Sequence, residues 1–275
     1  MFKDITIGQY YPADSIIHRL DPRTKIIFTF AYIILLFVLN NLWGYLAAFI
    51  FLAAVILMSK IPLGYIFKGL KALVLIILLT VVLNLFMTPG TPVASFGPFT
   101  LTAEGICNST YMALRLIFLI IGTNIMTLTT SPIDLTDGME FCIKGIPFVR
   151  RYAHELSMMM SIALRFIPTL MEETDKIMKA QKARGADFES GNLISRAKAL
   201  VPILVPLFVS AFRRADELAT AMEARCYRGG ENRTRMNQLR FTKADAITFI
   251  VLLAFTGLLI YSRFITWPLP FPFSV

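Results

Sequence analysis

Long apolar runs alternate with shorter polar segments along most of the chain. Each run approaches the roughly 17–25 residues that an α-helix needs to cross the hydrocarbon core of a bilayer. The pattern therefore predicts an all-α fold, a polytopic bundle of membrane-spanning helices. The five runs lie at 26–39, at 42–58, at 72–87, within 111–130 and within 244–262.

Polar residues mark the ends of these runs. Asp21 is suited to cap the first helix, and Pro22 fits its first turn. Asn40 and Asn41 separate the first run from the second. Residues 88–105 are rich in Pro, Gly and Thr, and this composition predicts a loop.

The region 131–243 has a different pattern. From residue 152 to 183, apolar positions follow helical spacing but charged residues interrupt them, so this segment is not expected to span the membrane. Pro168 is expected to bend this helix or divide it into two. The helix is expected to end at Ala183-Arg184-Gly185, where glycine is a good stop signal.

The same pattern repeats over residues 193–227. The apolar stretch 199–209 is too short to cross a bilayer, and Pro202 is suited to begin a new helix there. Pro206 would then kink that helix or move its start later. This second amphipathic helix is expected to end at Ala224-Arg225-Cys226. The chain is thus expected to comprise transmembrane helices one to four over 1–130, a cytoplasmic region over 131–243, and a last transmembrane helix over 244–275.

The charge distribution orients the chain. Of the 275 residues, 56% are hydrophobic, and 27 Lys and Arg outnumber 18 Asp and Glu, for a net charge of +9. In a soluble protein this excess would suggest nucleic acid, but cytoplasmic loops of membrane proteins also collect cations. We therefore expect no nucleic-acid partner. The basic segments fall on one side if five spans run from a cytoplasmic N-terminus, which predicts a multi-pass protein of the cell membrane. Arg115, inside the fourth run, could face the outer surface or the bundle interior.

The sequence offers little for catalysis or metal binding. It has neither a phosphate-binding GxxxxGK[ST] loop nor a G-x-S-x-G or H-E-x-x-H motif. Its three cysteines are isolated and do not form a zinc-type spacing. We expect no catalytic residue, no metal ligand and no cofactor bound by this chain. A secondary transporter or channel, and a membrane-bound enzyme, are the rival interpretations, although the spans offer little beyond Arg115, Asn84 and Asn124 as polar groups.

Arg184 and Arg225 allow two interpretations. An arginine at the end of a helix interacts favourably with the negative end of the helix dipole, which needs no partner. Two equivalent helix ends, each with a planar guanidinium, also suit docking on the carboxylates of two similar partner sites.

Two sets of residues together resemble the transmembrane T component of energy-coupling factor transporters. One is the string from Gly8 to Lys25, GQYYPADSIIHRLDPRTK, and the other is the pair of Ala-Arg-small triplets. The resemblance covers essentially the whole chain, and Cys226 is its one variation. The matching N-terminal residues include Pro12, Ser15, His18, Asp21, Pro22, Arg23 and Lys25; the coupling triplets are Ala183, Arg184, Gly185 and Ala224, Arg225, Cys226.

The resemblance implies a coupling subunit with partners. A T component binds two ATP-binding-cassette (ABC) ATPase subunits and a small membrane S component that captures a vitamin or another micronutrient. Arg184 and Arg225 would each pair with acidic residues in a groove of one ATPase. ATP and magnesium would then be bound by the ATPases, and a methionine-rich amphipathic surface of this chain would carry the S component.

Overall fold

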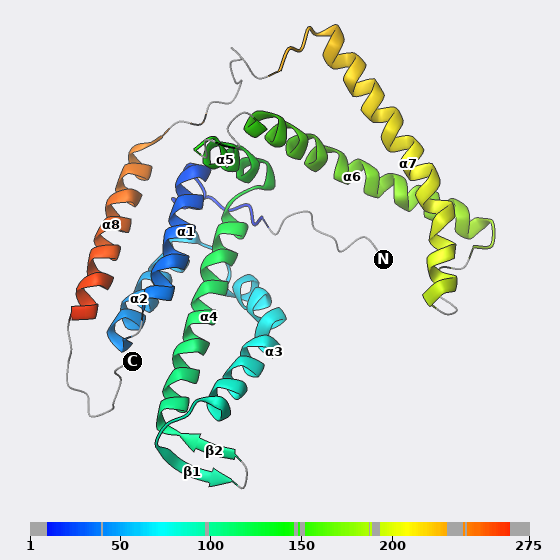
Figure 1. Ribbon diagram of the computed structural model, residues 1–275. Coiled ribbons are helices and arrows are strands. Elements are labelled where there is room, and N and C mark those ends of the chain that lie inside the picture. Colours follow the sequence, from blue (N-terminus) through cyan, green and yellow to red (C-terminus); the bar gives the residue numbers. More distant parts are fainter. Residues whose placement is uncertain are drawn as a thin grey trace. The chain divides into compact units, whose positions relative to one another are not determined.

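The computed structural model describes residues 10–39, 41–96, 99–145, 152–186, 193–229 and 241–264, together with 148, 188 and 239. Within these residues the chain forms helices and one hairpin of two strands (Figure 1). The elements are α1 (Pro22–Val38), α2 (Leu42–Ser59), α3 (Leu63–Met87), β1 (Pro92–Phe96), β2 (Phe99–Thr102), α4 (Ala103–Thr129), α5 (Pro132–Lys144), α6 (Ala153–Ala183), α7 (Leu193–Ala224) and α8 (Lys243–Phe264).

Four of the described helices are long and apolar enough to cross a membrane: α2, α3, α4 and α8. The predicted all-α, polytopic membrane fold is confirmed. The first apolar run forms α1, which has 17 residues and is not among the four. The passage of α1 through the membrane therefore stays a prediction.

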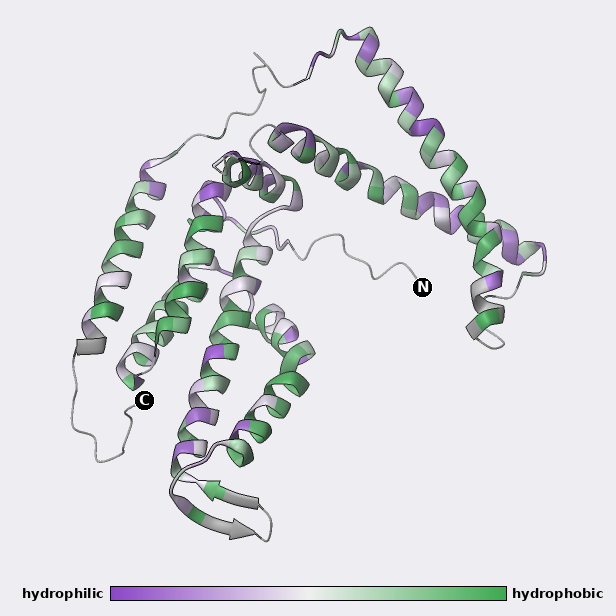
Figure 2. Ribbon diagram, viewed as in Figure 1, coloured by the Kyte–Doolittle hydropathy of each residue, from purple (hydrophilic) through white to green (hydrophobic). Residues whose placement is uncertain are grey.

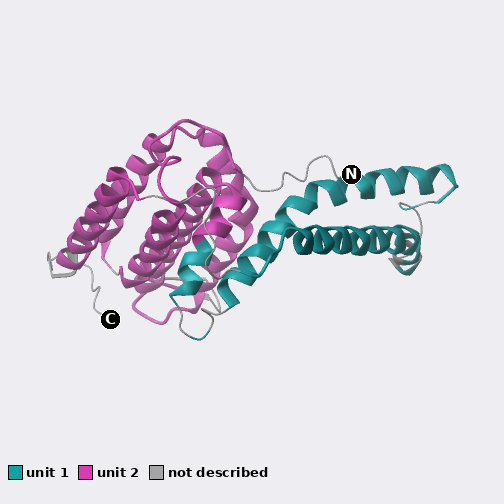
Figure 3. Ribbon diagram, turned by 90° about the horizontal axis from the view of Figure 1, so that it is seen from above, with its two compact units in different colours: residues 1–7, 139–238 teal, residues 8–138, 239–275 magenta. Residues whose placement is uncertain are grey.

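The chain divides into two compact units (Figure 3). Unit 1 comprises residues 1–7 and 139–238, and unit 2 comprises residues 8–138 and 239–275. Unit 1 holds α6 and α7, whereas unit 2 holds the four candidate spans and α1. The boundaries expected after residues 130 and 243 separate membrane-spanning from cytoplasmic segments, which is a different division from that into compact units. These boundaries stay a prediction.

The core of unit 2 forms where α1, α2, α4 and α8 meet. Aromatic rings fill much of it: Phe51 stacks on Phe255 at 4.4 Å between centroids, and Tyr45 stacks on Tyr111 at 5.3 Å. Outside this core, large apolar side chains stay exposed, and α3 is coloured largely as hydrophobic in Figure 2. Exposed apolar faces of this extent suit helices that are solvated by lipid.

Arg115 lies inside this bundle. Its Nη2 donates to the carbonyl oxygen of Leu39 at 2.9 Å, and its Nε donates to the hydroxyl of Tyr45 at 3.1 Å. Leu39 is the residue that caps the C-terminus of α1, where the helix dipole favours a cation. Arg115 is half-buried and faces the turn between α1 and α2.

The expected loop over 88–105 is wrong in part. β1 and β2 pair antiparallel in this segment, with Phe96 opposite Phe99, and α4 begins directly afterwards at Ala103. Thr102 caps α4 by accepting from the backbone N–H of Gly105 at 3.0 Å. The apolar and β-branched residues of the segment favour strands, whereas its Pro and Gly residues, which include Gly97 and Pro98 in its middle, favour a loop.

The prolines of unit 1 do not divide their helices as expected. α6 runs through Pro168 without a break, and α7 begins at Leu193 and includes both Pro202 and Pro206. Of the two outcomes expected at Pro168, the division is therefore wrong and the bend stays a prediction; the new helix start expected at Pro202 is wrong. A proline removes one N–H bond and kinks a helix, but a long helix can absorb that loss. Figure 1 shows α7 changing direction along its length.

Candidate functional site

The C-terminus of α6 closes in a Schellman motif. The N–H of Ala186 donates to the carbonyl of Gln181 at 3.0 Å, and the N–H of Gly185 donates to the carbonyl of Lys182 at 3.0 Å. Gly185 has a positive φ of 87°, the left-handed conformation that this motif requires. Ala183 is the last helical residue and Arg184 is the C-cap.

The C-terminus of α7 closes in the same way. The N–H of Tyr227 donates to the carbonyl of Met222 at 3.0 Å, and the N–H of Cys226 donates to the carbonyl of Glu223 at 2.8 Å. Cys226 takes the left-handed conformation with a φ of 57°, at the position that Gly185 occupies on α6. Because Ala224 is the last helical residue, Arg225 occupies the cap position that Arg184 has on α6.

The two triplets are therefore one structural motif, used twice. In each, the small first residue ends the helix, the arginine is the cap, and the third residue turns the chain. Arg184 and Arg225 are both exposed, and neither side chain forms a hydrogen bond or ion pair with any residue that the structure describes. Both guanidinium groups are thus available to a partner.

α6 and α7 pair as an antiparallel hairpin, which places the two arginines far apart. Arg214 of α7 forms an ion pair with Glu173 of α6. Gln181, near the end of α6, donates to the carbonyl of Pro202, near the start of α7, at 3.5 Å. The hydroxyl of Tyr227, just past α7, lies 3.4 Å from Nε2 of His154 at the start of α6. Since α6 has 31 residues, Arg184 and Arg225 lie about 45 Å apart along the hairpin.

The end of α7 is also held by side chains. The hydroxyl of Tyr227 donates to the sulfur of Met158 at 3.0 Å and lies 3.4 Å from Nε2 of His154. Nδ1 of His154 lies 3.7 Å from the buried carboxylate of Glu140 in α5, which also pairs with Lys144 at 2.7 Å. These contacts connect the second triplet to α6 and to the C-terminal part of α5.

A continuous apolar stripe is exposed along the middle of α7. Its members recur at intervals of one and three or four residues, so they lie on one side of the helix. Each is between 46% and 72% exposed: Leu200, Val201, Leu204, Val205, Phe208, Val209 and Phe212. Met159 and Met160 of α6 are exposed as well. Such a surface is typical of a contact with another protein or with lipid.

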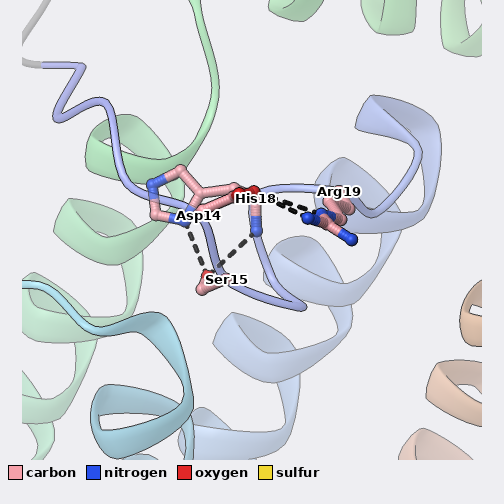
Figure 4. A network of polar contacts seen from close by, with 4 residues as sticks. All are labelled: Asp14, Ser15, His18 and Arg19. Carbon is pink, nitrogen blue, oxygen red and sulfur yellow. Dashed lines mark hydrogen bonds and ion pairs between the residues drawn. The ribbon is translucent and has the colours of Figure 1, made fainter.

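From Tyr10 onward, the N-terminal string lies in unit 2 and connects helix ends there; Gly8 and Gln9 lie outside the described residues. Ser15 bonds Nδ1 of His18 at 2.7 Å, next to the ion pair between Asp14 and Arg19 (Figure 4). Nε2 of His18 lies 3.0 Å from the carbonyl of Tyr11. A carbonyl only accepts, so Nε2 carries the proton and Nδ1 accepts from the Ser15 hydroxyl. Burial lowers the pKa of His18, which favours this neutral form.

Asp21 and Lys25 connect three helix ends. The Asp21 carboxylate accepts from the N–H of Arg23 at 2.9 Å, and the Asp21 N–H donates to the carboxylate of Asp245 in α8 at 2.9 Å. Lys25 donates to the carbonyl of Thr129, the last residue of α4, at 2.8 Å.

Other residues of the string have local roles. Pro22 is the first residue of α1, Arg23 lies over the ring of Phe241 at 5.7 Å, and Pro12 is exposed. Lys25 also donates to the carbonyl of His18 at 3.1 Å. The string thus connects the ends of α1, α4 and α8 within unit 2, and it contains neither of the arginine motifs.

Three residues with clear roles were missed in the sequence. Asp245 is fully buried and caps α8 by accepting from the N–H and hydroxyl of Thr242. The spacing Thr242-x-x-Asp245 before an apolar run is a capping-box signal that could have revealed it. Glu140 and Tyr227 carry no comparable signal, because their contacts join distant parts of the chain.

Comparisons with known proteins show the family of the chain. A family profile described as CbiQ, cobalt transport protein, matches residues 13–236. A protein of Thermosediminibacter oceani is 61% identical over 267 residues, which covers 96% of this chain and 99% of that protein. One of Clostridium kluyveri is 57% identical over 96% of this chain and 98% of its own, and one of Bacillus subtilis is 46% identical over 96% and 100%.

All three relatives are described as the energy-coupling factor transporter transmembrane protein EcfT. The family match covers three of the candidate spans described in the structure, α2, α3 and α4, and both arginine motifs, and the first relative covers 96% of the chain. The chain therefore belongs to the CbiQ family, among the transmembrane proteins of energy-coupling factor transporters.

Proposed function

We propose that this transporter component couples two ABC ATPase subunits to a small membrane S component, for uptake of a vitamin or another micronutrient. The chain itself would bind neither ATP nor magnesium, and both would reside in the ATPases. The proposal is supported by the lack of a phosphate-binding loop in the sequence.

The observation that carries the proposal is the repeated motif at the ends of α6 and α7. Each motif presents one exposed arginine at a rigid turn, and the two lie about 45 Å apart along the hairpin. Two equivalent groups at this separation suit two similar subunits better than one binding site. The guanidinium of each would pair with carboxylates of one ATPase.

The apolar stripe of α7 supports the proposal that an S component is the second kind of partner. Its seven members, from Leu200 to Phe212, form a surface that an apolar helix of an S component would cover. The stripe belongs to the same helix as Arg225. Movement of an ATPase docked at Arg225 would therefore reach the S component through α7.

A stand-alone channel or secondary transporter has less support. Such proteins place ionisable residues along a substrate path inside their spans. Arg115 instead donates to the carbonyl of Leu39 and to the hydroxyl of Tyr45, so its role in unit 2 is that of a helix cap.

Simultaneous replacement of both arginines tests the proposal. The variant R184A/R225A should lose the ATPases on purification while it keeps the S component and its membrane insertion, and substrate uptake should stop. Wild type and both single variants serve as comparisons. If the double variant assembles and transports normally, both arginines are helix caps only, and the coupling function would have to be abandoned.

Thiol labelling tests the proposed orientation, in which the N-terminus and unit 1 are cytoplasmic. Cys107 is near the start of α4, Cys142 is in α5, and Cys226 ends the second motif. In sealed cells a membrane-impermeant thiol reagent should react with Cys107 alone. Cys226 should react only after the cells are permeabilised. Reaction of Cys226 in sealed cells would reverse the proposed topology.

A further inference from the structure

A cavity of about 560 Å³ lies beside the second motif, within unit 1. Three arginines line it: Arg165 from α6, Arg225 at the end of α7, and Arg228 just beyond. All three are exposed, and none of the lining residues is a carboxylate. Within the part of the chain that the structure describes, none of the three arginine side chains forms an ion pair.

We propose that this cavity binds an acidic segment of the partner ATPase, with at least two carboxylates. The inference rests on the proposed function and deepens it, because it adds Arg165 and Arg228 as determinants of which ATPase docks at α7. Three unneutralised guanidinium groups around one cavity repel each other, and carboxylates that enter it relieve this repulsion.

The other lining residues favour a polypeptide as the occupant. Met158, Ile162 and Met222 give the cavity an apolar part next to the cationic part. A segment with both acidic and apolar side chains would fill both parts, whereas a lone phosphate would leave the apolar part in water. An anionic lipid headgroup is the competing occupant, and the experiment below separates the two.

The cavity also distinguishes the two ends of the hairpin. The last turn of α6 adds only Lys182 to Arg184, whereas Arg225 is joined by an arginine from a second helix. An ATPase with one acidic residue in its groove would suit the α6 end. An ATPase with an acidic cluster would bind more tightly at the α7 end. Each of the two ATPase subunits would therefore dock at its own end of the hairpin.

The experiment measures the affinity of the ATPases for the full-length chain carrying R184A, in membranes with its S component, so that the α7 end carries the binding. Arg165→Ala and Arg228→Ala are added singly and together, and Arg213→Ala is the matched control. Arg213 is an exposed arginine of α7 that lines a different cavity, together with Glu217. Each cavity variant should weaken binding by up to about fivefold, as expected for one partly solvated charge pair. The control should change it by less than about twofold.

Salt dependence adds a second measurement. Binding through the α7 end, measured with R184A, should fall more steeply with salt than binding through the α6 end, measured with R225A. Lys at position 165 or 228 should preserve more affinity than Ala, because it keeps the charge.

Three outcomes would overturn the inference. In the first, R165A and R228A behave like R213A although R225A still weakens docking, so that the proposed function stands without the cavity. In the second, the two variants leave ATPase affinity unchanged but reduce binding of the complex to vesicles with anionic lipid, relative to neutral vesicles. In the third, R184A/R225A assembles normally, and then the proposed function itself fails.

Discussion

The ends of α6 and α7 are the same turn built from different residues. Both use the two Schellman hydrogen bonds, and both place an exposed arginine at the cap. The α6 end uses Gly185 in the left-handed position and Ala186 after it. The α7 end uses Cys226 and Tyr227. The backbone geometry at the arginine is thus preserved although the side chains around it differ.

The difference shows how each end is stabilised. Glycine adopts a positive φ at no steric cost, so the α6 end needs no further support. A residue with a side chain loses roughly 1–2 kcal/mol in this conformation. At the α7 end, the contacts of Tyr227 with Met158 and His154 offset the cost at Cys226. The left-handed turn at the α6 end therefore needs no tertiary contact to offset a cost in φ, whereas the turn at the α7 end is supported by the tertiary contacts of Tyr227.

The largest expected effect comes from the arginines themselves. If each docks in a desolvated groove, R184A or R225A should cost about 2–5 kcal/mol of binding at its own site. That is roughly a 30-fold to several thousand-fold loss, measured as affinity for the isolated ATPase that docks there. Because the other end stays bound, co-purification of the whole complex should survive a single change better than substrate uptake does.

Lysine replacements control for charge alone. R184K and R225K should restore binding only in part, since lysine lacks the planar fork. If each Ala variant lost only about 0.3–1 kcal/mol of helix stability and no binding, the interaction with the helix dipole would be the whole role of these residues.

The sequence predicted the elements whose signals are local. Apolar runs predicted the spanning helices, and Gly185 predicted the end of α6. The triplets identified both arginine motifs in advance, although the hydrogen bonds that make them one motif became visible only in the structure. Asp21 and Pro22 were assigned correctly to the start of α1.

Features that depend on distant contacts could not be predicted in this way. Pro202 signals a helix start, yet α7 passes through both Pro202 and Pro206 because its packing against α6 outweighs two lost bonds. The contact of Asp21 with Asp245 joins residues 224 positions apart. Nothing in the string around Tyr227 indicates that it reaches His154 across the hairpin.

Replacement of the residue in the left-handed conformation is expected to change the stability of each helix end by an intermediate amount. The change should be a loss at the α6 end and a gain at the α7 end. Gly185→Ala should destabilise the end of α6 by about 1 kcal/mol or more, although space is open around Gly185. Cys226→Gly should stabilise the end of α7 by up to about 1 kcal/mol. Amide hydrogen exchange of the last turns measures both, at about fivefold in protection per kcal/mol.

Cys226→Ala separates the backbone effect from loss of the thiol. It keeps the side-chain carbon that disfavours the left-handed conformation, so its protection should match the wild type rather than Cys226→Gly. Equal protection in the Ala and Gly variants would show that φ at this position carries no cost, and the proposed difference between the ends would fail.

The smallest expected effect tests the tertiary contacts at the α7 end. Tyr227→Phe keeps the ring and the backbone but removes the hydroxyl that donates to Met158 and lies near His154. A single partly solvated hydrogen bond contributes about 0.5–1.5 kcal/mol, and the sulfur acceptor puts this one at the lower end. Protection of the last α7 turn should fall by roughly twofold to threefold, while the last α6 turn stays unchanged. Tyr152→Phe, an exposed tyrosine at the start of α6, is the matched control. In the Cys226→Gly background, Tyr227→Phe should leave the protection of the last α7 turn nearly unchanged, because the turn no longer depends on support from α6.

If Tyr227→Phe instead loosened both helix ends equally, the two motifs would be stabilised by one shared network rather than separately.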